Sequence, residues 1–73
     1  MANRPIHEIR RGLIRVRIWR NRTRDGARHT VTVARLFRNG DQWKESSRFC
    51  RDDLPLASLA LGEAFIWLQG NSD

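Results

Sequence analysis

The hydrophobic pattern of the chain changes once, at Arg51–Asp53, and this change constrains the fold more than any other feature. Before it, apolar and polar residues alternate with a period of two, which is typical of strands with one buried face. After it, apolar residues recur with helical spacing as far as Gln69. The pattern predicts an α+β fold: an antiparallel three- to four-stranded sheet with one C-terminal helix packed on one face, in the order (β)βββα.

The length of 73 residues allows one small domain with a marginal core. We expect residues 1–73 to form that domain, with residues 1–5 as a disordered arm and residues 70–73 as a tail. Segment Ile6–Arg10 is a candidate for an additional first strand. The connection Asn21–Arg28 contains the hairpin pair Asp25-Gly26 and is expected to be longer than two residues. Asn39-Gly40 predicts a second hairpin. The three main strands are expected at Leu13–Arg20, Arg28–Arg38 and Gln42–Cys50.

Alternation gives the expected sheet one apolar face and one basic face. Arg35 is the exception, because it falls on the apolar face. Either its side chain snorkels at the sheet edge or a bulge shifts the register. The residues expected beneath the helix are Ile14, Val16, Ile18, Val31, Val33, Phe37, Trp43 and Phe49.

The C-terminal helix is expected to begin at Asp52 or Asp53, whose carboxylate can cap the free N–H groups. Gly70-Asn71 is expected to end it. The helix has two apolar stripes, whereas a surface helix needs only one. One stripe, which includes Ala57, Leu61 and Ala64, is expected to face the sheet. The second stripe predicts a homodimer interface, formed by Leu56, Leu59, Ala60, Ile66 and Trp67.

The charge of the chain is positive and uneven. The formal net charge is +6, and residues 1–38 hold eleven arginines against only Glu8 and Asp25. A surface this basic predicts a polyanionic partner. Arginine binds phosphate and stacks on bases, and tryptophan offers a flat surface to an unpaired base. The expected nucleic-acid-binding residues on the open sheet face and the first hairpin are Arg15, Arg17, Trp19, Arg22, Arg24, Arg28, Thr30, Thr32, Arg38, Lys44 and Arg48.

Other function classes have little support in the sequence. His7, His29 and Cys50 lack the paired spacing of zinc ligands, and no glycine-rich phosphate loop is present. We therefore expect no enzyme, no metal or other cofactor and no small-molecule substrate. A lone cysteine, no signal peptide and no long apolar run predict a cytoplasmic chain without membrane contact, with nucleoid association as one option.

The order of elements resembles the whirly-like single-stranded DNA binders, which include transcriptional coactivators of the positive-cofactor-four type and Pur-alpha-type repeats. Gly12 followed by the alternating segment Leu13–Trp19 is similar to the first part of their pattern. Phe49–Leu54, a strand that enters an acidic helix cap, looks like their last strand and helix start. The resemblance implies a dimer that holds single-stranded DNA across the sheet and acts in transcription regulation, with Arg15, Arg17 and Trp19 on the binding face.

Two alternatives remain open. The βββα order is also similar to arm-type integrase domains and plant ethylene-response domains, which lay a sheet into the major groove of duplex DNA. A small interaction protein or inhibitor could instead use the basic face to dock an acidic protein surface.

Overall fold

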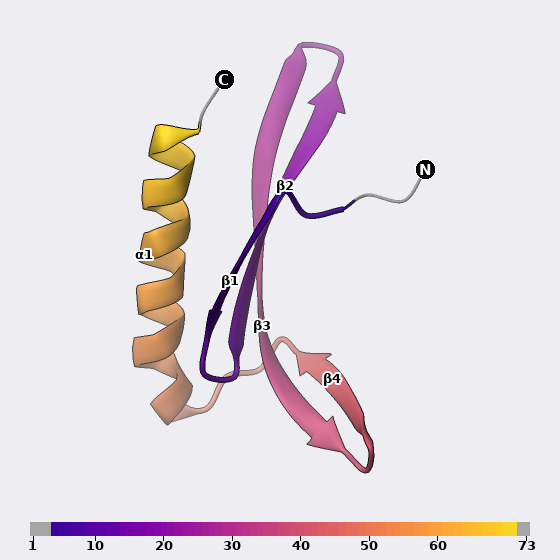
Figure 1. Cartoon of the computed structure of the whole chain (residues 1–73), viewed down its shortest axis with the longest axis vertical. Helices are drawn as coiled ribbons and strands as arrows, with labels where there is room; N and C mark the ends of the chain where they lie inside the picture. The colour runs from indigo at the N-terminus through magenta and orange to yellow at the C-terminus, as the bar shows by residue number, and fades with distance from the viewer. Residues whose placement is uncertain (1–3, 72–73) are drawn as a thin grey trace.

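The computed structural model describes residues 4–71 and confirms the predicted fold class (Figure 1). Its four strands form one antiparallel sheet in the order β1-β2-β3-β4, so the proposed first strand is present. The one α-helix of this part of the chain lies on one face of the sheet. The elements are β1 (His7–Arg11), β2 (Ile14–Thr23), β3 (Gly26–Asn39), β4 (Gln42–Ser46), the 3-10 turn η1 (Arg51–Asp53) and α1 (Leu54–Gly70).

The hairpin formed by β2 and β3 has longer strands and a shorter turn than the sequence predicted. Thr23 pairs with Gly26, so only Arg24 and Asp25 form the turn, and the prediction of a longer connection is wrong. The cause is that Asn21 and Arg22 continue the strand pairing instead of leaving it. The first and last turns place Gly12 and Gly40 at positive φ, a backbone conformation that glycine adopts without a steric cost.

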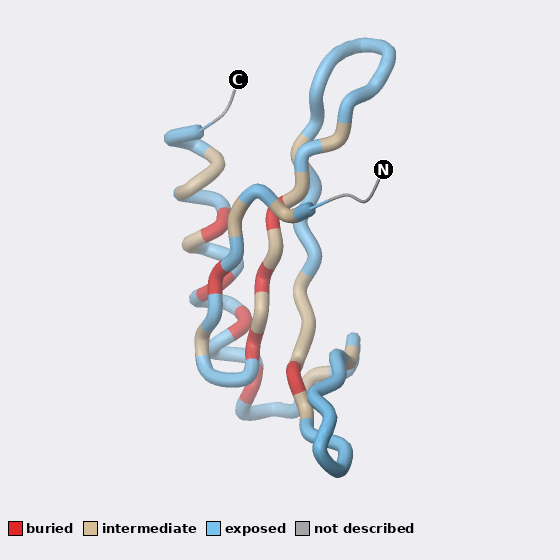
Figure 2. The backbone as a smooth tube through the Cα atoms, turned by 45° about the vertical axis from the view of Figure 1, so that its right-hand side comes forward, coloured by how far each residue is buried: buried red, intermediate tan, exposed pale blue. Residues whose placement is uncertain are grey.

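The core lies under only half of the sheet. Ile14, Val16 and Ile18 of β2 are fully buried, and Ile9 of β1 joins them. They pack against Ala57, Ala60 and Ala64, which are small enough for the helix to approach the sheet closely. In Figure 2 the buried segments gather on β1, the first half of β2 and the facing side of α1. Val31 of β3, expected beneath the helix, is 39% exposed because α1 lies over β1 and β2.

The helix is rotated relative to the predicted orientation. Ala60 is fully buried in the core, and Trp67 packs partly against it, so neither lies at an outer dimer surface as predicted. The Trp67 ring stacks on His7 of β1 with the ring centroids 4.6 Å apart. Leu61, predicted to face the sheet, is 41% exposed. The alanine stripe sets this rotation, because it gives the closest fit to the branched side chains of β2.

Asp53 explains how Arg35 is tolerated on the apolar face. The pairing of β3 with β2 runs unbroken as far as Arg35, and its pairing with β4 runs unbroken from Arg35 onward, so no bulge is present at this position. Nε of Arg35 lies 2.7 Å from Oδ2 of Asp53 in an ion pair. The same carboxylate oxygen accepts a hydrogen bond from the Cys50 backbone N–H at 2.7 Å. Asp53 is the N-cap residue of α1, as expected, but its carboxylate binds these two groups rather than the helix N–H groups.

Strand β4 is shorter than predicted, and its side chains lie on the opposite faces of the sheet from those predicted. It ends at Ser46, and residues 47–50 follow without regular structure. Trp43 pairs with Arg38, and Lys44 pairs with Phe37. Because paired residues share a face, Lys44 lies on the helix side of the sheet and Trp43 lies on the other side, 60% exposed. The predicted faces were wrong because they were assigned from Trp43 and Phe49, whereas the pairing with β3 sets them. Phe49 does pack partly against the core.

The two chain ends fall partly outside the described residues. Of the predicted arm 1–5, residues 1–3 lie outside them, and Arg4 and Pro5 have no regular structure. Of the predicted tail 70–73, Gly70 belongs to α1 and residues 72–73 lie outside the described range. The side-chain amide of Asn71 donates a hydrogen bond to the Trp67 carbonyl, which closes the last turn of the helix.

Candidate nucleic-acid interface

The sheet face turned away from α1, here called the open face, carries most of the predicted binding residues. The register places Arg15, Arg17 and Trp19 of β2 on this face beside Ala34, Thr32 and Thr30 of β3. Pairing with β1 and β4 adds four residues that the prediction did not include. The complete set of charged and aromatic residues on the open face is Glu8, Arg10, Arg15, Arg17, Trp19, Arg28, Arg38, Trp43 and Glu45.

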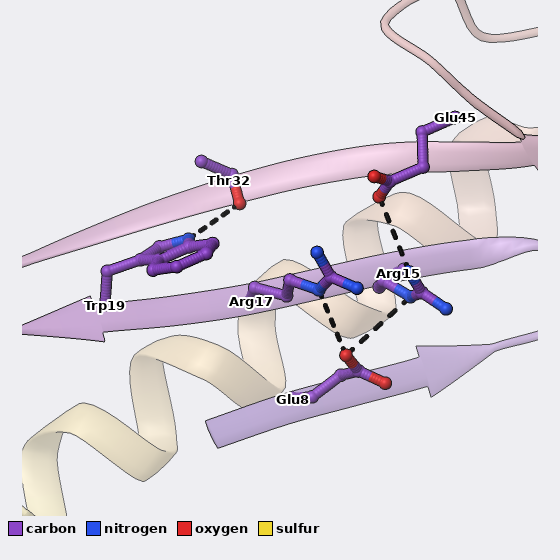
Figure 3. A network of polar contacts seen from close by, with 6 residues as sticks. All are labelled: Glu8, Arg15, Arg17, Trp19, Thr32 and Glu45. Carbon is purple, nitrogen blue, oxygen red and sulfur yellow. Dashed lines mark hydrogen bonds and ion pairs between the residues drawn. The ribbon is translucent and has the colours of Figure 1, made fainter. Parts of the chain in front are cut away.

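The central arginines of the open face are already paired with carboxylates (Figure 3). Nε of Arg17 donates a hydrogen bond to Oε1 of Glu8 at 3.1 Å. Oε1 of Glu8 also lies 3.7 Å from Nε of Arg15, and Oε1 of Glu45 lies 3.7 Å from Nη1 of Arg15. Two carboxylates from the two edge strands therefore hold both arginines in place and offset their charge.

Trp19 is fixed in position by a hydrogen bond across the strand pair. Its indole N–H donates to the hydroxyl oxygen of Thr32 at 3.0 Å, and the ring lies beside Arg17 (Figure 3). The neighbouring hydroxyl of Thr30 accepts a hydrogen bond from the Asn21 side chain at 3.1 Å. A threonine hydroxyl that accepts one bond retains its own hydrogen for a second partner. Thr30 and Thr32 can therefore still donate to a phosphate oxygen.

A hollow of about 430 Å³ opens on the same face beside Trp19. Arg17, Trp19 and Thr32 line it from one side, and Glu45 and Ser47 line it from the other. Ala34 lies between Thr32 and Leu36 along this face of β3 and contributes only a methyl group. The hollow therefore brings together an aromatic ring, a cation, a carboxylate and hydroxyl groups.

The far end of the β2–β3 hairpin, residues 20–28, is here called the hairpin arm. It extends past the core and is exposed almost throughout (Figure 2). Arg22 lies on the helix side of the sheet, Arg28 on the open face and Arg24 in the turn. Among residues 4–71, the side chains of these three arginines have no hydrogen bond or ion pair. Asp25 is the only acidic residue of the arm.

The remaining predicted binding residues are more scattered. Lys44 lies on the helix side, as noted above. Arg48 lies in the segment after β4, where its backbone N–H donates to the Ser46 hydroxyl. Arg38 is on the open face, and its Nε donates to the Gly40 carbonyl oxygen at 3.0 Å. The structure therefore brings together Arg15, Arg17, Trp19, Thr30 and Thr32, with the hairpin arm at one end.

Four residues of the open face were not among the predicted binding residues: Glu8, Arg10, Trp43 and Glu45. Glu8 was within reach, because alternation in segment Ile6–Arg10 places it opposite the apolar Ile9. Trp43 and Glu45 depend on the register of β4, which the pattern of that segment did not define. A large tryptophan between polar residues is ordinarily read as a core residue.

The outer surface of α1 is unusually apolar. Six of its large apolar side chains are between 36% and 70% exposed. The helix has one charged residue, Glu63, which pairs with Arg11 and joins α1 to β1. The predicted interface residues Leu56, Leu59 and Ile66 lie on this surface. The full set is Leu54, Leu56, Leu59, Leu61, Phe65 and Ile66.

The described part of the chain has neither a metal-binding cluster nor a membrane-spanning helix. Within residues 4–71, no three His, Cys, Asp or Glu side chains gather in a group that could hold a metal ion. The helix there is not long and apolar enough to cross a membrane. Comparisons with protein-family models, curated proteins and solved structures found no match to this chain.

Proposed function

We propose that this chain is a nucleic-acid-binding protein that holds single-stranded DNA along its open face and hairpin arm. The observation that carries the proposal is that unpaired arginines of the arm adjoin a fixed tryptophan on the same sheet. Arg22, Arg24 and Arg28 are available to phosphates because no side chain of residues 4–71 competes for them. Bidentate contacts from arginine to phosphate give strong, charge-assisted hydrogen bonds.

Two exposed or half-exposed tryptophans favour unpaired bases over duplex. Trp19 and Trp43 are both on the open face. Their partners on β3, Thr30 and Arg38, are eight residues apart, a separation of about 26 Å along an extended strand. Stacking of a base on an aromatic ring contributes ~1–3 kcal/mol and requires a base that is not paired in a helix. A single strand that follows the open face can meet both rings.

The hairpin arm supports duplex binding as a second candidate. It is a two-stranded ribbon with Arg22 and Arg28 on opposite faces. The major groove of B-form DNA is wide enough to admit such a ribbon. In this mode the arm would enter the groove and Trp19 would stay unstacked. The two modes therefore differ in the response of the tryptophan.

Tryptophan fluorescence titration separates these candidates. The ligands are a single-stranded oligonucleotide, the same sequence as duplex, and heparin as a plain polyanion, each at two salt concentrations. We expect saturable quenching that is strongest with the single strand. Stronger duplex binding without quenching would favour the ribbon mode. Equal, salt-sensitive binding of all three would refute nucleic-acid recognition and favour an acidic protein partner.

The proposal includes a homodimer formed through the apolar surface of α1. Exposed apolar surfaces of this extent on small proteins mark interaction sites. The partner that fits best is a second copy, because α1 has no cation and lies opposite the basic open face. Two strongly basic chains can meet there with their open faces pointing outward. We also propose a cytoplasmic location, because the lone Cys50 fits a reducing environment.

Analytical ultracentrifugation tests the dimer. Ile66, 70% exposed on α1, is replaced by Glu, and Trp43, 60% exposed on the open face, is replaced by Glu as the matched control. We expect the wild type and Trp43→Glu to sediment as dimers and Ile66→Glu as a folded monomer. A wild type that stays monomeric at tens of micromolar would exclude the dimer and leave the binding proposal standing.

A further inference from the structure

The outer edge of β1 has no strand beside it among residues 4–71, because β1 is the first strand of the sheet order. An edge strand presents unpaired backbone N–H and C=O groups to which another strand can bind. A groove of about 660 Å³ lies along this edge, between β1 and the side of α1 that carries Glu63, Ile66 and Trp67. The edge of the sheet and the helix therefore offer one surface with both backbone polar groups and apolar side chains.

The charges of β1 complement each other when two copies of the strand pair antiparallel. With a two-fold axis at Ile9, Glu8 of each chain lies opposite Arg10 of the partner subunit. Opposite charges across two strands are favourable, whereas like charges are unfavourable. A register shifted by two residues would place either two glutamates or two arginines opposite each other. A shift of one residue would turn the two helices to opposite faces of the sheet.

The side chains of both residues have capacity for these pairs. Among residues 4–71, the Arg10 side chain has no hydrogen bond or ion pair. Glu8 contacts two arginines of β2 through Oε1, and its Oε2 takes no part in those contacts. On the helix side, the same register sets Arg11 opposite His7 of the partner subunit. The charge of Arg11 is already offset by Glu63.

The position of α1 fits this pairing. The helix packs on β1 and β2 alike, so it lies over the pair nearest the edge. Pairing of two β1 edges would therefore separate the two helix axes by two strand spacings, or about 9.6 Å. Packed helices have interaxial distances of about 8–10 Å. The spacing of strands thus brings the two helices to packing distance without any change in either chain.

The side of α1 that faces this edge is apolar. Ile66 is 70% exposed and lines the groove. Leu56 lies against Gly12, in the turn after β1. Leu59 shares their helix face, because it follows Leu56 by three residues and precedes Ile66 by seven. These three exposed residues would be covered by the second helix.

From these observations we propose that the homodimer forms through the β1 edges and joins two four-stranded sheets into one continuous antiparallel sheet. The two α1 helices lie side by side on one face. The inference rests on the proposed function and specifies which surface the dimer uses. Such an interface is isologous, since the same residues contribute from both chains. The two open faces become one surface, so a single strand of nucleic acid can cross from one chain to its partner.

Charge exchange tests this pairing by analytical ultracentrifugation. Arg10→Glu and Glu8→Arg should each weaken self-association at least about tenfold, because two attractive cross-strand pairs become repulsive. An equimolar mixture of these two variants should form a heterodimer as tightly as the wild type, since every pair is again opposite in charge. Arg22→Glu, the same charge change on the hairpin arm, should leave the dimer intact.

Arg10→Glu removes no side-chain contact within residues 4–71, so its monomer should keep the wild-type circular dichroism spectrum. Should Glu8→Arg unfold, Arg10→Glu and its control Arg22→Glu decide alone. A dimer that survives Arg10→Glu but not Ile66→Glu would overturn the edge pairing and favour helix layers stacked face to face. A folded mixture that stays monomeric, or a monomeric wild type, would overturn it as well. Failure of the wild type to bind a single strand would overturn the proposed function and leave the edge pairing standing.

Discussion

The two halves of strand β2 have similar sequences and very different surroundings. Both alternate arginine with other residues, yet the side chains of Ile14–Ile18 have partners on both faces of the sheet. Its apolar side chains pack under α1, and its two arginines are paired with glutamates of β1 and β4. The half that contains Arg20–Thr23 extends past the helix, and Arg22 there has no side-chain partner among residues 4–71.

This difference shows that formal charge and available charge are separate quantities. An arginine that is paired with a carboxylate must exchange that anion for the phosphate. Its net contribution to the free energy of binding is therefore small. An arginine that faces only water and counterions releases those counterions to solution, which drives binding at low salt. We infer that the first half of β2 supplies stability and position, and that the hairpin arm supplies most of the affinity.

The largest expected effect comes from removing a buried side chain of the covered half. Ile18→Ala should lower the free energy of unfolding by roughly 2–5 kcal/mol, because it deletes three buried carbons and leaves a cavity against α1. A chain of this size has on the order of 5 kcal/mol of stability, so the variant will be largely unfolded. Thermal and urea denaturation measure the loss.

Arg22→Ala in the uncovered half is the matched control for stability. We expect its free energy of unfolding to stay within about 0.5 kcal/mol of wild type, since it removes no packing and no ion pair. A comparable loss in both variants would mean that the arm contributes to the cooperative core, contrary to the division drawn above.

The next largest effect concerns nucleic acid. The variant Arg22→Gln/Arg24→Gln/Arg28→Gln should bind a single strand about 100-fold more weakly near 0.1 M salt, from about fivefold for each lost phosphate contact. The slope of log affinity against log salt should become shallower by about 2 for three contacts. Fluorescence anisotropy over a salt series measures both quantities.

A second triple variant removes the same formal charge from another region. Lys44→Gln/Arg48→Gln/Arg51→Gln takes three cations from the segments after β3. We expect this variant to lose less than tenfold in affinity for a single strand, with only a small change in the slope of log affinity against log salt. Equal losses in the two triple variants would show that net charge alone governs binding.

The sequence predictions were correct for the faces of β2 and wrong for the faces of β4 and the rotation of α1. Strict alternation in β2 defined its faces correctly, because its apolar residues are branched, uncharged and consecutive on one side. Alternation in β4 failed, since a large Trp43 on the open face outweighed the polar residues around it. The predicted rotation of α1 was wrong for a related reason. Ala57, Ala60 and Ala64 are less hydrophobic than the leucines, but they face the sheet because their small side chains let the helix pack closely against it.

Ion pairs between distant strands were beyond the reach of the sequence. Glu8 and Glu45 are 37 positions apart and meet at Arg15 only because β1 and β4 are the two edges of one short sheet. Charge counting assigned Arg15 and Arg17 to binding without these partners. The unpaired state of Arg22, Arg24 and Arg28 among residues 4–71 depends equally on tertiary structure, because the arm extends away from Glu8, Glu45 and Glu63.

The smallest expected effect is also the sharpest test of the comparison. Arg17→Gln and Arg22→Gln each remove one arginine of β2 and lower the net charge equally. Arg22→Gln should weaken single-strand binding about fivefold near 0.1 M salt. Arg17→Gln should weaken it by less than about twofold with little change in the salt slope, because the freed Glu8 remains beside Arg15 at 3.7 Å. Conversely, Glu8→Gln should strengthen binding, since it releases Arg17 and Arg15 to phosphates. If Arg17→Gln weakens binding as much as Arg22→Gln, the carboxylates of the open face do not compete with phosphate, and the two halves of β2 contribute alike.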